Sequence, residues 1–197
     1  MQEFALYSLR FFKGLIANPG AVGAISASTP YVGQMLVDAA HVRDAQIVLE
    51  FGPGTGVVTE VLLDALRPDA TFMAFEVSDE FVRVIRDRFP HITLHHDSAE
   101  NARKHLEAIG QTHCDAIVSG LPWTVFDDQL QNSLLDAIMD VLRPGGHFST
   151  FMYFFSPALP KGRSFLQKLR QRMVDVERLP IVLRNFPPAY VFRARRP

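Results

Sequence analysis

A glycine-rich segment flanked by acidic residues is the part of the sequence best suited to bind a nucleoside-like ligand. The segment follows an apolar run and comprises Glu50, Gly52, Pro53, Gly54, Thr55 and Gly56. Glycines let the backbone turn tightly and come close to a ligand at the start of a helix. Glu76, with Val77 beside it, ends the next apolar run, where a carboxylate can accept hydrogen bonds from ribose hydroxyls. This order of features predicts a ligand site rather than a purely structural turn.

The elements that must position these groups alternate along the chain. Apolar runs predict strands over residues 47–51, 71–76, 92–96, 114–119 and 147–153. Helical patterns lie between them, over residues 55–66, 78–89, 100–109 and 127–142. Thr29 and Pro30 predict the start of an earlier helix that runs to residue 40. Such alternation predicts an α/β fold, a doubly wound Rossmann-like sheet that is mostly parallel and has helices on both faces.

The carboxyl-terminal part follows a different pattern. A basic helix is predicted over residues 162–173, and two strands over residues 176–184 and 190–195. The short connection between these strands favours an antiparallel pair at the sheet edge, which brings the sheet to seven strands. We expect residues 29–197 to form one domain, preceded by residues 1–28 as an amphipathic helix and a segment that covers the cofactor.

The net charge of −1 conceals an uneven distribution. Residues 31–157 hold 8 basic and 18 acidic side chains, whereas residues 158–197 hold 10 basic and 2 acidic ones. A split of this kind indicates a basic face that meets phosphate on lipid or nucleic acid, although a solvated basic tail is the alternative. The single cysteine, Cys114, excludes a disulfide scaffold and favours a cytoplasmic location.

The amino terminus has the pattern of an amphipathic helix. Phe4, Phe11 and Leu15 fall on one helical face, and Arg10 and Lys13 lie opposite. This pattern is typical of a helix at a membrane interface, and equally of a terminal helix packed on its domain. No apolar stretch of the sequence is long enough to span a bilayer.

The glycine segment and the residues after it resemble the class I S-adenosylmethionine-dependent methyltransferases. The fingerprint of dinucleotide dehydrogenases fails, because Val57 stands where its third glycine would be. The resemblance implies that the cofactor is S-adenosylmethionine and that Asp97 and Ser98, after the third predicted strand, bind its adenine. It also implies that Ser119 contacts the cofactor.

Residues Ser119 to Trp123 are similar to the N-[LIV]-P-[YF] loop of amino-methyltransferases such as the rRNA adenine dimethylases. Here Ser119 replaces the asparagine, and a hydroxyl does not offer the paired donor and acceptor of an amide. This departure disfavours nucleic acid as the substrate. Methylation of adenine N6 in RNA or DNA stays the alternative function, and an inactive cofactor-binding scaffold is the third.

Four flanking segments look like those of the bacterial phospholipid N-methyltransferases. They are residues 12–14, 22–30, 152–157 and 184–189. The resemblance implies a peripheral-membrane enzyme that methylates phosphatidylethanolamine towards phosphatidylcholine at an anionic membrane surface. It also implies that Ser28 and Thr29 cover the methionine part of the cofactor.

The expected roles at the acceptor follow from the chemistry of methyl transfer. Trp123 and Tyr153 would surround the amine, because aromatic faces suit a headgroup that becomes more choline-like with each methylation. The carbonyls of Ser119 and Gly120 would orient the amine.

The remaining polar candidates are cationic or imidazole side chains. Arg184, with Lys161 or Arg163, would hold the lipid phosphate. His95, His96 and Tyr153 are candidates for the general base, or water takes the proton. His95 and His96 face opposite sides of a strand and so cannot bind one metal ion together with His91. We therefore predict no metal site.

Overall fold

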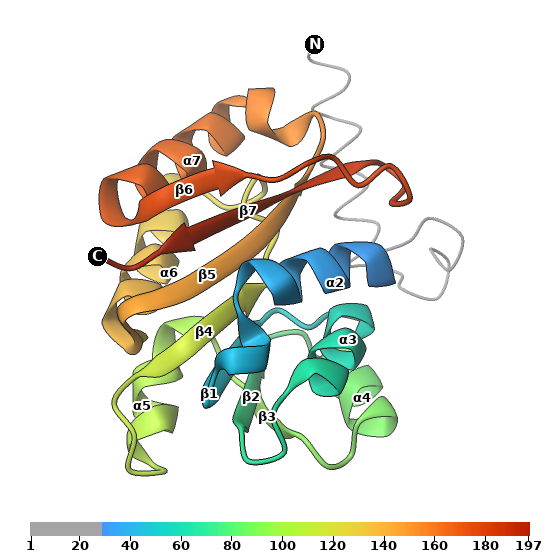
Figure 1. Ribbon diagram of the computed structural model, residues 1–197, viewed down its shortest axis with the longest axis vertical. Coiled ribbons are helices and arrows are strands. Elements are labelled where there is room, and N and C mark those ends of the chain that lie inside the picture. The colour runs from blue at the N-terminus through green and yellow to red at the C-terminus, as the bar shows by residue number, and fades with distance from the viewer. Residues whose placement is uncertain (1–28) are drawn as a thin grey trace.

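A computed structural model describes residues 29–197 as one seven-stranded sheet with helices on both faces (Figure 1). The strand order is β3-β2-β1-β4-β5-β7-β6. β1 to β5 pair in parallel, and β7 runs antiparallel to both β5 and β6. The strands are β1 Ile47–Phe51, β2 Thr71–Glu76, β3 Thr93–His96, β4 Cys114–Ser119, β5 Leu142–Tyr153, β6 Val174–Arg178 and β7 Ala189–Arg195. The predicted mostly parallel sheet with an antiparallel carboxyl-terminal pair is confirmed.

The helices divide between the two faces of the sheet. Their bounds are α2 Pro30–Ala39, α3 Val57–Ala65, α4 Asp79–Arg88, α5 Ala102–Glu107, α6 Asp128–Val141 and α7 Pro160–Arg172. Buried side chains of α2 and α3 pack into one core, and those of α5, α6 and α7 pack into the other. Figure 1 shows α6 and α7 together behind β5 and β7, away from α2.

The fully buried strand β1 supplies both cores through the two-residue period of a strand. Ile47, Leu49 and Phe51 belong to the core beneath α5 and α6, whereas Val48 belongs to the core beneath α2 and α3. The same alternation turns Glu50 towards α3, where it reaches Thr59. The acidic residue before the glycine segment is therefore buried by the fold itself.

Two predicted boundaries are wrong, and the backbone gives the reasons. β5 begins at Leu142 rather than at residue 147, because Gly145 donates to the Arg196 carbonyl and the Gly146 carbonyl accepts from Arg196, which keeps this segment paired with the end of the chain although Gly145 has a φ of 75°. β6 ends at Arg178 rather than at residue 184. Pro180 lacks the N–H that a strand ladder needs, and the chain leaves the sheet there.

The amphipathic helix expected within residues 1–28 lies outside the described residues and stays a prediction. Between residues 29 and 197, no helix is long and apolar enough to cross a bilayer.

Candidate active site

The glycine segment and the loop after β4 meet at the carboxyl edge of the sheet. Gly52 has a φ of 74°, and a Cβ there would lie 2.9 Å from Leu121 Cδ2. A Cβ on Gly120 would lie 2.4 Å from the carbonyl oxygen of Gly52. Such distances leave no room for a side chain, so the two loops depend on glycine to approach each other. Pro53 accepts a hydrogen bond from Gly56 at 2.9 Å, which closes the turn into α3.

Glu76 holds the glycine segment against the end of β2. Its Oε2 accepts a hydrogen bond from the Gly54 N–H at 3.2 Å, and its Oε1 accepts from the Val77 and Ser78 N–H groups at 2.9 Å. Only 7% of the residue is exposed. Val77 itself is 67% exposed at this edge, which leaves an apolar surface beside the carboxylate. This carboxylate is thus fixed in place by the chain's own backbone.

The environment of Glu50 favours the protonated, uncharged form of its carboxyl group. It is 1% exposed, and its Oε2 accepts a hydrogen bond from the Thr59 hydroxyl at 2.8 Å. Burial raises its pKa to about 8, and the nearby Glu76 carboxylate adds to the increase, although the bond from Thr59 opposes it.

Asp97 follows β3 and is part of a cluster with two histidines. Its Oδ2 lies 2.8 Å from His105 Nε2, and its Oδ1 accepts from Asn101 Nδ2 and from the Ser98 N–H, both at 2.8 Å. The bonds from His105 and then Asn101 lower the pKa of Asp97 to about 2. His95 stacks beside His105 with ring centroids 3.8 Å apart. The predicted adenine-binding carboxylate is therefore an ion held at a fixed position.

The sequence aligns Ser119 with the asparagine of the related amino-methyltransferase loop. In the structure, the loop after β4 does not present the Ser119 hydroxyl as that alignment suggests. Ser119 is fully buried, and its Oγ accepts a hydrogen bond from the Leu121 N–H at 3.3 Å. Its carbonyl accepts from the Thr150 hydroxyl at 3.0 Å, and that hydroxyl accepts from Trp123 Nε1 at 3.0 Å. The hydroxyl of Ser119 is thus engaged within its own loop, and its carbonyl holds this loop to β5.

Trp123 is mostly a core residue. It is 1% exposed, and its ring stacks on Phe165 of α7 with centroids 4.4 Å apart. It still borders a pocket between the loop after β4 and the end of β5, lined by Gly120, Leu121, Pro122, Trp123, Thr124, Phe151, Met152, Tyr153 and Ser156. No side chain of this pocket is charged. Burial raises the pKa of Tyr153 to about 12, so its phenol keeps its proton at neutral pH.

The beginning of α2 lies against the loop between β6 and β7. Thr29 occupies the predicted N-cap position, but its hydroxyl makes no capping bond. Its Oγ1 is buried and has no hydrogen-bond partner among the described residues. Its N–H donates to Asn185 Oδ1 at 2.9 Å. A buried hydroxyl without a partner suits a residue that meets a ligand; Ser28 lies outside the described residues.

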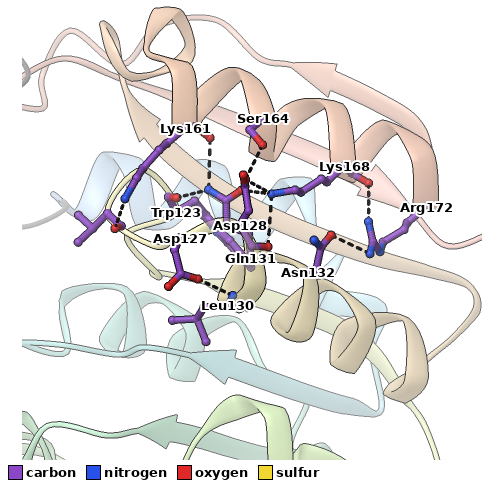
Figure 2. Close-up of polar contacts among 11 residues, drawn as sticks. Trp123, Asp127, Asp128, Leu130, Gln131, Asn132, Lys161, Ser164, Lys168 and Arg172 are labelled. Atoms are coloured by element: carbon purple, nitrogen blue, oxygen red, sulfur yellow. Dashed lines mark hydrogen bonds and ion pairs between the residues drawn. The ribbon is translucent and has the colours of Figure 1, made fainter.

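Part of the basic carboxyl-terminal charge is paired within the fold. Lys168 pairs with Asp128 (Figure 2), and Arg172 pairs with Asp136, so that α7 is held on α6. Two further pairs lie within the strands β6 and β7, Arg193 with Glu177 and Arg195 with Asp175. Because Asp175 and Glu177 belong to the segment itself, of these pairs only the two with α6 reduce its net positive charge.

The three predicted phosphate ligands lie at two separate places, and all are exposed. Lys161 and Arg163 lie at the start of α7, where the Lys161 ammonium donates to the Val125 carbonyl at 2.9 Å (Figure 2). The Arg184 guanidinium lies 4.9 Å from the ring centroid of Tyr31 at the start of α2. The structure groups Arg184 with α2 and not with the two α7 cations.

One residue that supports the site has no motif in the sequence. Gln131 is fully buried within α6, and its Nε2 donates to the Trp123 carbonyl at 2.6 Å and to the Lys161 carbonyl at 3.2 Å. Its Oε1 accepts from Lys168 at 2.9 Å (Figure 2). It thereby ties the loop after β4 to α7. The only sequence signal is an amide on the apolar face of a helix.

Comparison with known proteins agrees with this geometry. Residues 48–146 match the family model described as a methyltransferase domain. The chain is 29% identical over 199 residues to an ornithine lipid N-methyltransferase from Singulisphaera acidiphila, which covers 99% of this chain and 97% of that protein.

Two further relatives are more distant. A chloroplastic ribosomal RNA small subunit methyltransferase from Arabidopsis thaliana is 32% identical over 110 residues, or 49% of this chain and 31% of that protein. Among solved structures, the O-methyltransferase TomG from Streptomyces achromogenes, in complex with S-adenosylmethionine, superposes with a TM-score of 0.69. That match has 18% identity and covers 98% of this chain and 90% of TomG, so it shows the shared fold.

Proposed function

The chain belongs to the methyltransferase-domain family and depends on S-adenosylmethionine, and from that premise we propose that it methylates the amine of phosphatidylethanolamine. The pocket between β4 and β5 carries this proposal. Its lining is apolar and aromatic and contains no charged side chain. Such a lining accepts an amine as it gains methyl groups, because aromatic faces attract the resulting quaternary ammonium.

The residues at the carboxyl edge fit S-adenosylmethionine, which supplies an electrophilic methyl group on a sulfonium. Glu76 would accept hydrogen bonds from its ribose, and Asp97 would accept from its adenine, beside the exposed Val77. Thr29, with its buried and unpartnered hydroxyl, would contact the methionine part together with Ser28. Glu50, which is held by Thr59 just before the glycine segment, would support the backbone that binds the cofactor.

The acceptor amine must lose a proton before its lone pair can attack. Among the pocket residues only Tyr153 titrates, and a pKa of about 12 prevents it from acting as a base near neutrality. His95 and His96 lie on β3, which β2 and β1 separate from β4, so neither histidine borders the pocket. We therefore infer that water takes the proton. The chain itself aligns the nitrogen, carbon and sulfur atoms through the loop that contains Ser119 and Gly120.

The lipid phosphate and the membrane give the exposed cations a role. Arg184 is placed on the same side as Thr29 and Asn185, next to the end of β5 where the pocket lies. We assign it to the headgroup phosphate, with Lys161 and Arg163 meeting other phosphates of an anionic bilayer. The protein would then act as a peripheral-membrane enzyme of the cytoplasm.

The alternative is methylation of adenine N6 in RNA or DNA. The similarity to the chloroplastic ribosomal RNA methyltransferase favours it, but that similarity covers less than half of this chain. The hydroxyl of Ser119 is turned into its own loop and offers no amide to a nucleobase. The lipid relative, in contrast, matches almost the full length.

A transfer assay decides between these substrates. The full chain and radiolabelled S-adenosylmethionine are incubated in three parallel reactions, one with phosphatidylethanolamine vesicles, one with ornithine lipid vesicles and one with ribosomal RNA. We expect label in phosphatidylethanolamine. Label in ornithine lipid alone would overturn the assigned headgroup, label in RNA alone would overturn lipid methylation, and no label in any arm would favour the scaffold.

A further inference from the structure

The loop between β6 and β7 exposes large apolar side chains to solvent. Leu183 is 73% exposed and Phe186 is 72% exposed. Two neighbouring segments add Tyr31, which is 52% exposed, and Phe154, which is 46% exposed. Soluble proteins rarely gather exposed side chains of this size without a binding role. We call these four residues the apolar patch.

Three segments that are distant in sequence meet at the apolar patch. The Phe154 N–H donates to the Pro188 carbonyl at 2.8 Å, which joins the end of β5 to the loop. The Arg184 guanidinium over the Tyr31 ring joins the loop to α2. In Figure 1 this loop extends beyond the sheet on the side of α2. The start of α2, the residue after β5 and the β6–β7 connection therefore lie close together, and each exposes a large apolar side chain.

The loop is held in a conformation that turns its polar residue inwards. Asn185 is fully buried, accepts from the Thr29 N–H at 2.9 Å and donates to the Pro187 carbonyl at 2.6 Å. Val182 and Ala189 pair across its base as an isolated bridge. In water, amide side chains are usually exposed and large apolar side chains are usually buried. This loop has the opposite arrangement, with Asn185 inside and Leu183 and Phe186 outside, so their exposure follows from the conformation of the loop.

The charge of the loop indicates the kind of surface it meets. Residues 179–190 contain Arg184 and no acidic residue. A cation among aromatic and aliphatic side chains matches a bilayer interface, where the ring and alkyl groups enter the acyl boundary and the guanidinium stays at the phosphates. Phe154 directly follows Tyr153, which lines the pocket, so a membrane on this patch lies next to the acceptor site.

We propose that the apolar patch, with Arg184 beside it, is a membrane-docking surface that holds the pocket at the lipid interface. The proposal rests on the lipid methylation assigned above, because a lipid amine stays at the interface while its acyl chains stay in the bilayer. A membrane-bound patch shortens the path from the bilayer to the pocket, so docking and catalysis share one side of the molecule.

The test compares vesicle binding of the full chain with that of the double variant L183S/F186S. Sedimentation with vesicles of phosphatidylethanolamine and phosphatidylglycerol should show binding at least tenfold weaker, equal to about 1.4 kcal/mol. The matched control is I109S/V174S, which removes two exposed apolar side chains, 47% and 37% exposed, away from the patch. The control should bind like the original chain. Equal binding by L183S/F186S would overturn the proposal.

A fluorescence readout reports insertion directly. The chain has one tryptophan, Trp123, which is buried, so F186W adds a reporter at the patch. Its emission should shift to shorter wavelength with vesicles and be quenched by brominated acyl chains. An unchanged spectrum would overturn insertion.

Two further measurements separate this proposal from the assigned activity. With a water-soluble, short-chain phosphatidylethanolamine, L183S/F186S should keep kcat within about twofold, because docking is bypassed; a large loss would overturn a role confined to docking. If no lipid is methylated but L183S/F186S still loses vesicle binding, the docking surface stands and the substrate assignment fails. If L183S/F186S instead dissociates a self-associated chain and keeps vesicle binding, the patch is a contact between copies.

Discussion

On the β1–β3 side of the carboxyl edge, acidic side chains are held by hydrogen bonds from the chain itself, whereas on the β5–β7 side the edge is aromatic and aliphatic. Glu76 accepts three backbone N–H groups, and Asp97 accepts one N–H and two side chains. Most side chains that line the pocket beside Tyr153, and all four of the apolar patch, are instead aromatic or aliphatic.

The difference reflects what each side has to recognise. A cofactor with fixed polar groups is best bound by donors and acceptors that are already in position, which reduces the ordering that binding requires. A headgroup that changes with each methylation is better accommodated by an apolar wall than by fixed donors. We therefore expect the cofactor side to tolerate little geometric change and the acceptor side to tolerate more.

The largest effect is expected for Gly120→Ala. Its Cβ would lie 2.4 Å from the Gly52 carbonyl oxygen, so the two loops must separate where the cofactor and the acceptor meet. We expect methyl transfer to fall at least about 100-fold, or roughly 2.7 kcal/mol. Gly110→Ala is the control, since nothing would lie within 4 Å of the Cβ of Gly110, although its φ, at 74°, is positive and that of Gly120 is not. Equal losses in the two variants would mean that the contact between the two loops does not cause the effect.

A smaller effect is expected for Glu76→Ala. It removes the carboxylate assigned to the ribose and frees the N–H groups of Gly54, Val77 and Ser78. We expect S-adenosylhomocysteine to bind about ten- to thirtyfold more weakly by calorimetry, which is about 1.4–2 kcal/mol. Glu60→Ala, which removes an exposed carboxylate from α3, is the control and should bind normally. Unchanged affinity in Glu76→Ala would remove this residue from the site.

The cofactor half of the fold was largely predictable because its determinants are contiguous. Glu50 and Glu76 lie at the carboxyl ends of β1 and β2, and Asp97 directly follows β3, so strand order alone brings them to one edge. The same locality predicted all five parallel strands, although β5 begins at Leu142 instead of residue 147 and β3 at Thr93 instead of residue 92.

The rest depends on pairings between residues far apart in sequence. Gln131 reaches Lys161 and Lys168, and Asn185 reaches Thr29 across most of the chain. Likewise, a count of the charged residues in 158–197 treats Lys168 and Arg172 as unpaired, whereas in the fold both pair with acidic residues of α6. No local pattern specifies these partners, and only the packed fold identifies them.

Glu50 is expected to make the stability of the fold depend on pH. Its folded pKa of about 8 lies above the unfolded value near 4.5, so between these pH values the native state keeps a proton that the unfolded state has lost. This contribution is complete below pH 4.5 and is lost as the pH rises through 8, by at most about 1.4 kcal/mol per pH unit.

Urea denaturation at pH 5.5 and 7.5 measures this contribution. We expect Glu50→Gln to lose about 1–2 kcal/mol less stability than the original chain over that interval, because the amide does not titrate. The comparison with Asp64→Asn, an exposed position on α3, removes effects common to any lost carboxylate. An identical pH dependence in Glu50→Gln and the original chain would show that Glu50 is ionised in the fold.

The smallest effect is expected for Asp136→Asn on the α6–α7 interface. Arg172 Nε lies 2.7 Å from Asp136 Oδ1, but the acidic side chain is 65% exposed, so solvent screens the pair. Arg172 also donates to Asn132 Oδ1 at 3.0 Å, which keeps it in place when the charge is lost (Figure 2). We expect a change of less than about 0.5 kcal/mol in unfolding free energy and no change in vesicle binding. Clearly tighter binding to anionic vesicles would instead show that ion pairing restrains a basic surface on α7, and docking would then extend beyond the apolar patch.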